Sequence, residues 1–368
     1  MTNSKFEYVK KFEQHDEIIP NMFILVRVDG HGFCDRHNFV KPNDERALNL
    51  MNDAARKVAE QFSEIILAYG QSDEYSFVFP PSAKCYNRRA SKLSSLISAA
   101  FTANYVHSWP LFFPTSPLPL DQPPPYFDGR AVAYPSIEVI RDYLSWRQCD
   151  CHINNLYNTT FWVLVDAINA FLQTSSEQPL TSEERKNSPR ISELFINRQW
   201  KYILKSDPVL PTQSSNKPKR MLQEDEVELI LRVLGFDGSL KGEGTSEEQD
   251  ELRNIVEMSR SQGSTTGFKN EILFRLGQNY NSMPAMFRKG TLIARVRKET
   301  VLSAPTAEEQ DTKQEERKHN KKQDSTELVQ FHEDIIKDHF WNAHPELLGV
   351  FQNGIPDPFQ TNSLRSKA

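Results

Sequence analysis

The sequence predicts an α+β fold of the split βαβ, ferredoxin-like type, in which helices cover an antiparallel sheet. Three observations support this fold. Strand-like and helix-like segments follow one another in the order β-α-β-β-α-β over the first third of the chain. Two of the strand-like runs flank a short polar turn and so predict a hairpin. The second half is more irregular, with helical apolar spacing that predicts a mainly helical C-terminal region.

The first elements follow from local pattern. Residues 22–29 are apolar and β-branched, which predicts a strand. Asn43 and Asp44 offer an N-cap, and apolar residues at steps of three and four from Leu48 to Phe62 predict a helix.

Four further elements complete the expected unit. The runs 64–69 and 75–79 predict the hairpin, and a helical apolar stripe marks residues 86–109. A proline-rich connection then leads to a last strand at 127–134. In the usual strand order of this fold, the first and third strands are antiparallel neighbours.

Composition shifts divide the chain into four expected parts. Residues 1–136 form the predicted sheet domain, and 137–300 form a second region with a polar insertion near 175–262. Residues 301–326 hold almost no large apolar side chains and are expected to be a disordered linker. Residues 327–368 regain helical apolar spacing between Phe331 and Leu348, which predicts a terminal helix and tail.

Bulk composition limits the partners. The chain has 368 residues, of which 38% are hydrophobic and 25% charged, and its net charge is −5. No run approaches the roughly 20 apolar residues of a membrane span, so we expect no membrane partner and residence in the cytoplasm or nucleus. Because the chain is acidic overall, nucleic-acid contacts are expected to be local. Cys149, Cys151 and His152 resemble half of a zinc site, but no second pair has matching spacing, which favours reduced thiols.

Two aspartates stand at strand ends. Asp29 ends the first strand-like run, and Asp73 lies in the turn between the hairpin strands. If the first and third strands are neighbours, these carboxylates meet at one edge of the sheet. Hard oxygen ligands in such a place suit Mg²⁺, which takes one or two carboxylates together with phosphate oxygens and water. The alternative is two unrelated turn aspartates, since aspartate favours turns.

Several motifs resemble the eukaryotic tRNA-histidine guanylyltransferase family. They occur in family order over nearly the whole chain: KFEYV at 5–9, RVDG at 27–30, KPNDERA at 41–47, AYGQSDEYSF at 68–77, RRASK at 88–92, FDGR at 127–130, DYLSWRQ at 142–148, HINNLYNT at 152–159, KNEILF at 269–274, RKGT at 288–291, and FW and HPE at 340–346. The resemblance implies a polymerase-palm-like catalytic domain at 1–136 and a tRNA-binding region at 137–300. It also implies a 3′-to-5′ nucleotidyl transfer. In the reaction that the resemblance implies, ATP would activate the 5′ end of histidine tRNA, the 3′-hydroxyl of GTP would attack that end, and one guanylate would be added. Family members usually form a homotetramer.

The resemblance also implies roles for individual residues. Asp29 and Asp73 would hold two Mg²⁺ ions with the carbonyl of Gly30, and Glu74 would add negative charge, unless it is a solvated glutamate. GTP would contact Ser72, Asp73 and the loop from Asp29 and Gly30 through His31, Gly32, Phe33 and Cys34. Arg89, Ser91 and Lys92 would meet the triphosphate at a helix start, where anions are favoured, although a solvated helix face is the alternative. Histidine tRNA would contact His152, Asn154, Asn155 and Lys269, while Phe161 and Trp162 are expected in a helix core.

The nucleotide loop departs from the family pattern. His31 stands where the family has arginine, Cys34 stands where it has histidine, and the loop is a few residues short. A mis-joined exon or a genuine change would both produce this loop. Two alternatives to the guanylyltransferase therefore stay open. One is a catalytically impaired tRNA-binding protein of the same fold. The other is a different palm-fold nucleotide enzyme, such as a cyclase, although the 152–159 motif argues against it.

Overall fold

A computed structural model describes residues 4–13, 15–30, 37, 39–175, 266–297, 326–345 and 347. The chain forms two compact units. Unit 1 consists of residues 1–38, 45–149 and 289–368, and unit 2 of residues 39–44 and 150–288. The predicted boundaries along the chain were at residues 136, 300 and 326, whereas the chain passes between the two compact units near residues 38, 44, 149 and 288. The predicted insertion at 175–262 and the predicted linker at 301–326 lie, apart from Ser175 and Thr326, outside the described residues.

The predicted β-α-β-β-α-β order is confirmed in unit 1. The elements are β1 (Phe23–Gly30), α2 (Glu45–Gln61), β2 (Leu67–Gln71), β3 (Glu74–Phe79), α3 (Ala90–Phe112) and β4 (Phe127–Tyr134). Two short 3-10 turns, η1 (Glu7–Phe12) and η2 (Cys85–Arg88), precede β1 and α3. The strands β1 and β3 are antiparallel neighbours, as the ferredoxin-like order requires.

The sheet is larger than predicted. Its order is β4-β1-β3-β2-β5-β6, because β5 (Thr291–Arg297) pairs with β2 and β6 (Thr326–Phe331) pairs with β5. The expectation of a mainly helical C-terminal region is therefore wrong for these two segments. The predicted terminal helix is wrong in its first part, because residues 331–337 are not helical. Its later part is helical in α12 (Asp338–Ala343) and again at residues 345 and 347.

Side-chain hydrogen bonds explain why the chain is not helical after β6. Gln148 donates to the carbonyl oxygens of Lys289 and Glu333, both at 2.8 Å, and accepts from the backbone N–H of Ile335 at 2.9 Å. These contacts use backbone groups that a helix would need for its own bonds. The apolar spacing that predicted a helix instead places Ile335, Phe340 and Trp341 in one buried cluster.

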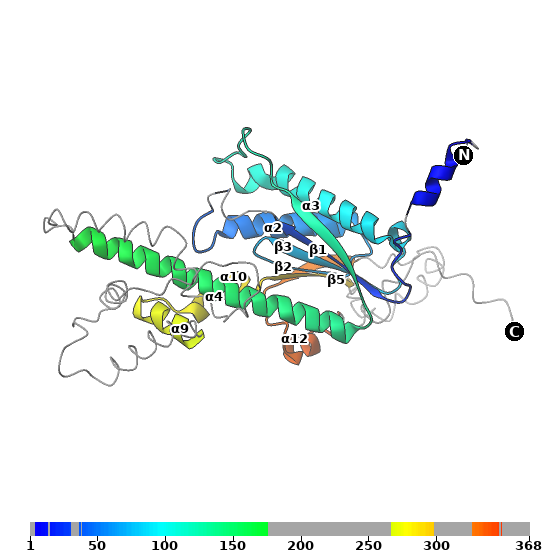
Figure 1. The fold of residues 1–368 in the computed structure, drawn as a ribbon. Coiled ribbons are helices and arrows are strands. Elements are labelled where there is room, and N and C mark those ends of the chain that lie inside the picture. Colours follow the sequence, from blue (N-terminus) through cyan, green and yellow to red (C-terminus); the bar gives the residue numbers. More distant parts are fainter. Residues whose placement is uncertain are drawn as a thin grey trace, which may run out of the picture. The chain divides into compact units, whose positions relative to one another are not determined.

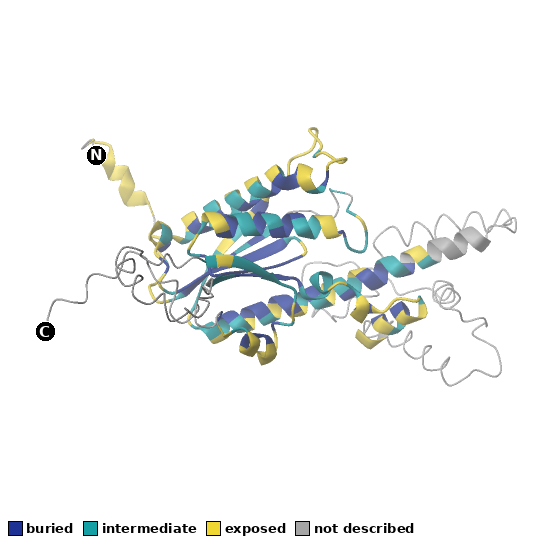
Figure 2. Cartoon of the chain, turned by 180° about the vertical axis from the view of Figure 1, so that it is seen from behind, coloured by how far each residue is buried: buried dark blue, intermediate teal, exposed yellow. Residues whose placement is uncertain are grey.

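Each face of the sheet is covered by different elements. Helices α2 and α3 lie on one face (Figure 1), where Val26, Phe77 and Phe101 are fully buried. The first turns of α4 (Ile137–Ser175) and α12 pack on the other face, where Leu25, Val78, Leu144 and Trp341 belong to one cluster. Figure 2 shows the inner strands β1, β2 and β3 mainly in dark blue, because nearly all their residues are buried, while β4 and β6 at the sheet edges are mostly only partly buried. Burial of this apolar surface on both faces is the main force that stabilises the sheet.

Unit 2 is built on the continuation of α4. Beside it lie α9 (Thr266–Arg275), η3 (Tyr280–Ser282) and the start of α10 (Ala285–Lys289). A small core joins Leu156 on α4 to Leu273 on α9 and to Tyr280. Phe161 is buried as predicted and Trp162 is partly buried, so both belong to the helix packing. Among the helices in the described part of the chain, none is long and apolar enough to cross a membrane.

Candidate active site

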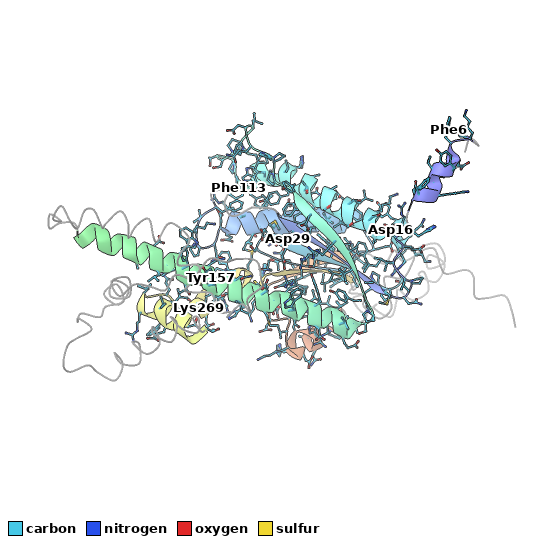
Figure 3. All side chains as sticks on the ribbon, viewed as in Figure 1. Phe6, Asp16, Asp29, Phe113, Tyr157 and Lys269 are labelled. Carbon is cyan, nitrogen blue, oxygen red and sulfur yellow. The ribbon has the colours of Figure 1, made fainter. Side chains whose placement is uncertain are left out.

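The edge of the sheet where β1 ends brings the two aspartates together. Asp29 pairs in register with Glu74, the first residue of β3, and Asp73 immediately precedes it. The backbone N–H of Gly30 donates to the carbonyl oxygen of Asp73 at 2.9 Å, which ties the end of β1 to the β2–β3 turn. Figure 3 labels Asp29 within unit 1. The predicted meeting of Asp29 and Asp73 at one edge is thus confirmed.

The sequence of the turn fixes its geometry. A Cβ on Gly70 would lie 2.2 Å from the ring of Tyr75, its cross-strand partner, so this position accepts only glycine. The Tyr75 hydroxyl donates to Asn52 Oδ1 at 2.9 Å and thereby joins the hairpin to α2. Ser72 has a φ of 52°, a left-handed conformation that a tight turn requires. These contacts hold Asp73 in place from both sides of the turn.

The electrostatics of Asp73 fit a bound cation. Burial raises the pKa of this carboxyl, and the negative charges of Asp29 and Glu74 raise it further, against hydrogen bonds from Ser72 and its own backbone. No group of three or more His, Cys, Asp or Glu side chains is placed to hold a metal in the part of the chain that the structure describes. Two carboxylates suit Mg²⁺, because this ion usually completes its shell with phosphate oxygens and water.

This pKa shift gives a stability prediction for the metal-free protein. A raised pKa means that the folded state prefers the protonated form, so stability falls as pH rises from the unfolded value of 3.8 toward the folded pKa. We expect Asp73→Asn to raise the melting temperature in EDTA at pH 7, and to lose that advantage near pH 4. In buffer with Mg²⁺ and GTP, the wild type should regain stability and the variant should not. A variant that melts below the wild type in EDTA at pH 7 would contradict the prediction.

Glu74 is not a solvated glutamate, so that alternative is wrong. Its side chain is buried and accepts hydrogen bonds from Arg147 Nη1, which lies 3.2 Å from each carboxylate oxygen. Gln71 Nε2 donates to the same carboxylate at 3.1 Å. The negative charge that was predicted beside the metal is present, and it is paired with a buried guanidinium. The partner was missed because Arg147 is 73 residues away in sequence.

The predicted triphosphate residues lie at the other end of the sheet. Arg88, next to Arg89, donates to the carbonyl of Met22, just before β1 begins. Asp29 lies near the opposite end of that strand, about 20 Å away at about 3.3 Å per residue. Within unit 1, the structure therefore does not bring Arg89, Ser91 and Lys92 together with Asp29.

The start of α3 already holds an anion. Asp16 Oδ2 accepts from the backbone N–H of Ser91 at 2.7 Å, and Asp16 Oδ1 accepts from Arg89 Nε at 3.1 Å. Hydrogen bonds from Ser91, together with Arg89, lower the pKa of Asp16 to about 2. A phosphate at this helix start would have to displace that carboxylate. Sequence pattern gave no signal for this contact, since Asp16 lies in an irregular segment.

Other predicted nucleotide residues are placed only in part. Ser72 is exposed in the β2–β3 turn beside Asp73, as a GTP contact requires. His31, Gly32, Phe33 and Cys34 lie outside the described residues, and their predicted contact with GTP stays a prediction.

The predicted tRNA-binding residues of unit 2 differ in how far they are exposed. Asn154 is exposed on α4, and His152 is partly exposed with its ring 5.4 Å from that of Tyr280. Asn155 donates to Asn43 Oδ1 at 2.7 Å and accepts from the Tyr280 hydroxyl at 3.1 Å, so it already links three segments. Lys269 is only 2% exposed, which contradicts its predicted place on a tRNA-facing surface. The surface position of Lys269 was predicted from its place in the family motif at 269–274 and not from helical periodicity.

The cysteines have separate environments. Cys149 is exposed, while Cys151 is buried and its thiol lies 3.7 Å from the carbonyl oxygen of Phe287. The burial of Cys151 and its hydrogen bond to a backbone carbonyl are typical of a reduced cysteine packed in a protein core.

Two family models match the chain. The model described as "tRNAHis guanylyltransferase" matches residues 6–135, and the model described as "Thg1 C terminal domain" matches residues 138–229 and 247–337. The second match includes most of the stretch that was predicted to be an insertion.

Curated proteins and a solved structure are similar over most of the chain. A tRNA(His) guanylyltransferase of Neurospora crassa is 38% identical over 373 residues, covering 97% of this chain and 99% of that protein. The enzyme of the same name from Schizosaccharomyces pombe is 50% identical over 202 residues, covering 54% and 76% of the two chains. The crystal structure of tRNA(His) guanylyltransferase from Saccharomyces cerevisiae has a TM-score of 0.51 and 36% identity, and covers 79% of this chain and 93% of that chain.

Proposed function

Since the chain belongs to the tRNAHis guanylyltransferase family, we propose that it adds one guanylate to the 5′ end of histidine tRNA. The substrates are GTP, ATP for activation of the 5′ end, and the tRNA. The observation that carries the proposal is the edge of the sheet where Asp29 and Asp73 are held together by the Gly30–Asp73 backbone hydrogen bond. The sequence similarity to the Neurospora crassa tRNA(His) guanylyltransferase covers 97% of this chain.

The residues of this edge have defined tasks in the proposed reaction. Asp29 and Asp73 would provide carboxylates for two Mg²⁺ ions, and Gly30 ends the strand beside them. When bound, these ions would stabilise negative charge on the entering and leaving oxygens of a phosphoryl displacement. The β2–β3 turn keeps Ser72 exposed beside Asp73. Its hydroxyl hydrogen-bonds the Asp73 carboxyl, and it would donate to a phosphate after leaving that bond.

The decisive experiment uses histidine tRNA that lacks the extra nucleotide. Purified full-length protein is incubated with ATP, Mg²⁺ and labelled GTP, and the label is located at the tRNA 5′ end. We expect incorporation that depends on ATP when the tRNA carries a 5′ monophosphate. Tight tRNA binding with no incorporation would instead support the impaired tRNA-binding protein. Formation of a cyclic nucleotide without tRNA would support the cyclase.

A second experiment tests the tRNA contacts. We expect His152→Ala and Asn154→Ala each to reduce kcat/KM for tRNA about tenfold, a typical loss for one base-stacking or base-edge contact. The apparent KM for GTP should change little. Asn281→Ala is the matched control, because Asn281 is also an exposed amide of unit 2 and was not predicted to touch tRNA. An equal loss in GTP and tRNA parameters would place these residues at the nucleotide instead.

We also propose that the protein is a homotetramer, as the family resemblance implies. The apolar side chains of η1 and the residue before it support an assembly, since Phe6, Tyr8, Val9 and Phe12 are all more than half exposed. Light scattering during size-exclusion chromatography measures the oligomer directly.

A further inference from the structure

A buried arginine on α4 reaches the metal edge of the sheet. The Arg147 side chain is 7% exposed, and its guanidinium carbon lies 3.4 Å from the centroid of the Trp146 ring. Its Nη1 atom contacts both carboxylate oxygens of Glu74 at 3.2 Å. A buried charge is stable only when its partner is held in good geometry, so this pair strongly restricts where the Glu74 carboxylate can lie.

The position of Glu74 makes this restriction relevant to the metal site. Glu74 follows Asp73 directly and is the register partner of Asp29 on the neighbouring strand. Directly paired residues of an antiparallel sheet project their side chains from the same face, a few ångströms apart. Three carboxylates therefore stand at this edge, and one of them is occupied by Arg147 and Gln71.

We propose that Arg147 is a positioning residue that sets the ligands and the charge of the metal site. This inference rests on the proposed function, because it assigns the metal-binding carboxylates to that reaction. The guanidinium keeps Glu74 away from the ions, so that Asp29 and Asp73 remain the protein's carboxylate ligands. Its positive charge also offsets one of three neighbouring negative charges, which prevents the site from holding a divalent ion too tightly to exchange it.

The test measures Mn²⁺ binding to the full-length protein with GTP present, by electron paramagnetic resonance, alongside guanylate addition. Glu74→Gln removes the carboxylate that offsets the positive charge of Arg147 near the site, and should weaken Mn²⁺ binding about 5–10-fold. Arg147→Met frees the Glu74 carboxylate and should strengthen Mn²⁺ binding about 5–10-fold while guanylate addition falls. The double variant should return to within about threefold of the wild-type affinity, because the two charges are removed together.

Arg141→Met is the matched control. Arg141 lies on the same helix, pairs with Asp338 at 2.6 Å and lies over the ring of Trp341, but it does not reach the metal edge. It should change thermal stability without changing Mn²⁺ affinity. If Glu74→Gln and Arg147→Met also lower the melting temperature but leave Mn²⁺ affinity within about twofold, the pair is only structural and the proposal is wrong.

Arg147→Lys is the alternative variant to use if Arg147→Met does not fold. Lysine keeps the charge but loses the planar fork, so Mn²⁺ affinity should stay near the wild-type value while Glu74→Gln weakens it. Equal Mn²⁺ affinities in these two variants would overturn the proposal. A wild-type protein that binds Mn²⁺ normally but adds no guanylate would refute the proposed function. The effect of Arg147 and Glu74 on Mn²⁺ affinity could still be measured in that case, so the two failures are distinguishable.

Discussion

Replacing Asp29 or Asp73 by asparagine is expected to reduce guanylate addition at least about a thousandfold, while the protein stays folded. Each substitution removes one of the two carboxylates at the end of β1 and in the adjoining turn. Asparagine has nearly the same shape as aspartate, so the Gly30–Asp73 backbone hydrogen bond should survive. The loss therefore reports the missing charge rather than a distorted turn.

The measurement is incorporation of labelled GTP into histidine tRNA, with circular dichroism as a check on folding. Asp121→Asn provides the control, because Asp121 is exposed in the connection between α3 and β4 of the same unit. Activity should be unchanged in this control. Substantial incorporation by Asp73→Asn would show that the edge of the sheet is not the metal site, whatever the family membership implies.

The part of the fold that was predicted correctly depends on local sequence. The segments 22–29 and 127–134 carry strand patterns of their own, and β1 and β4 lie within one residue of these ranges. Asp29 and Asp73 were found for the same reason, since each follows directly from where a strand ends. Known topology of the split βαβ unit then placed the two ends together.

The parts that were missed depend on contacts between distant segments. Strand β5 pairs with β2, and β6 pairs with β5. The local sequence near Thr326 has no pattern that would predict this pairing. Asp16 at the start of α3 and Arg147 beside Glu74 are likewise 75 and 73 residues from their partners. Such contacts follow from tertiary packing, which local periodicity does not encode.

For Lys269, the prediction failed because it relied on family resemblance instead of on local pattern. Its motif implied a surface role, yet the side chain is buried within unit 2. Resemblance to a family identifies which positions matter and leaves open whether they act by touching a substrate or by supporting the fold. The burial of Lys269 favours the second kind of role.

Arg88→Ala is expected to lower the free energy of unfolding by about 3–4 kcal/mol, a large loss for a single substitution. The Arg88 side chain is buried and donates five hydrogen bonds to backbone carbonyl oxygens: those of Ile18, Ile19, Met22, Pro81 and Ala83, at distances from 2.7 to 3.2 Å. These carbonyls belong to the segment before β1 and to the connection after β3. Alanine would leave several of them without a donor, and a buried unpaired carbonyl is costly.

Urea unfolding of the full-length protein measures this loss, with an unchanged dependence on urea as evidence that the transition stays comparable. Arg89→Ala is the matched control, since Arg89 is the neighbouring arginine but is exposed and has one surface partner, Asp16. Its loss should be much smaller. Arg88→Lys should fall between the two, because lysine keeps the charge but lacks the five donors of the guanidinium. Equal stabilities of Arg88→Ala and Arg89→Ala would mean that the segment before β1 is held by other contacts.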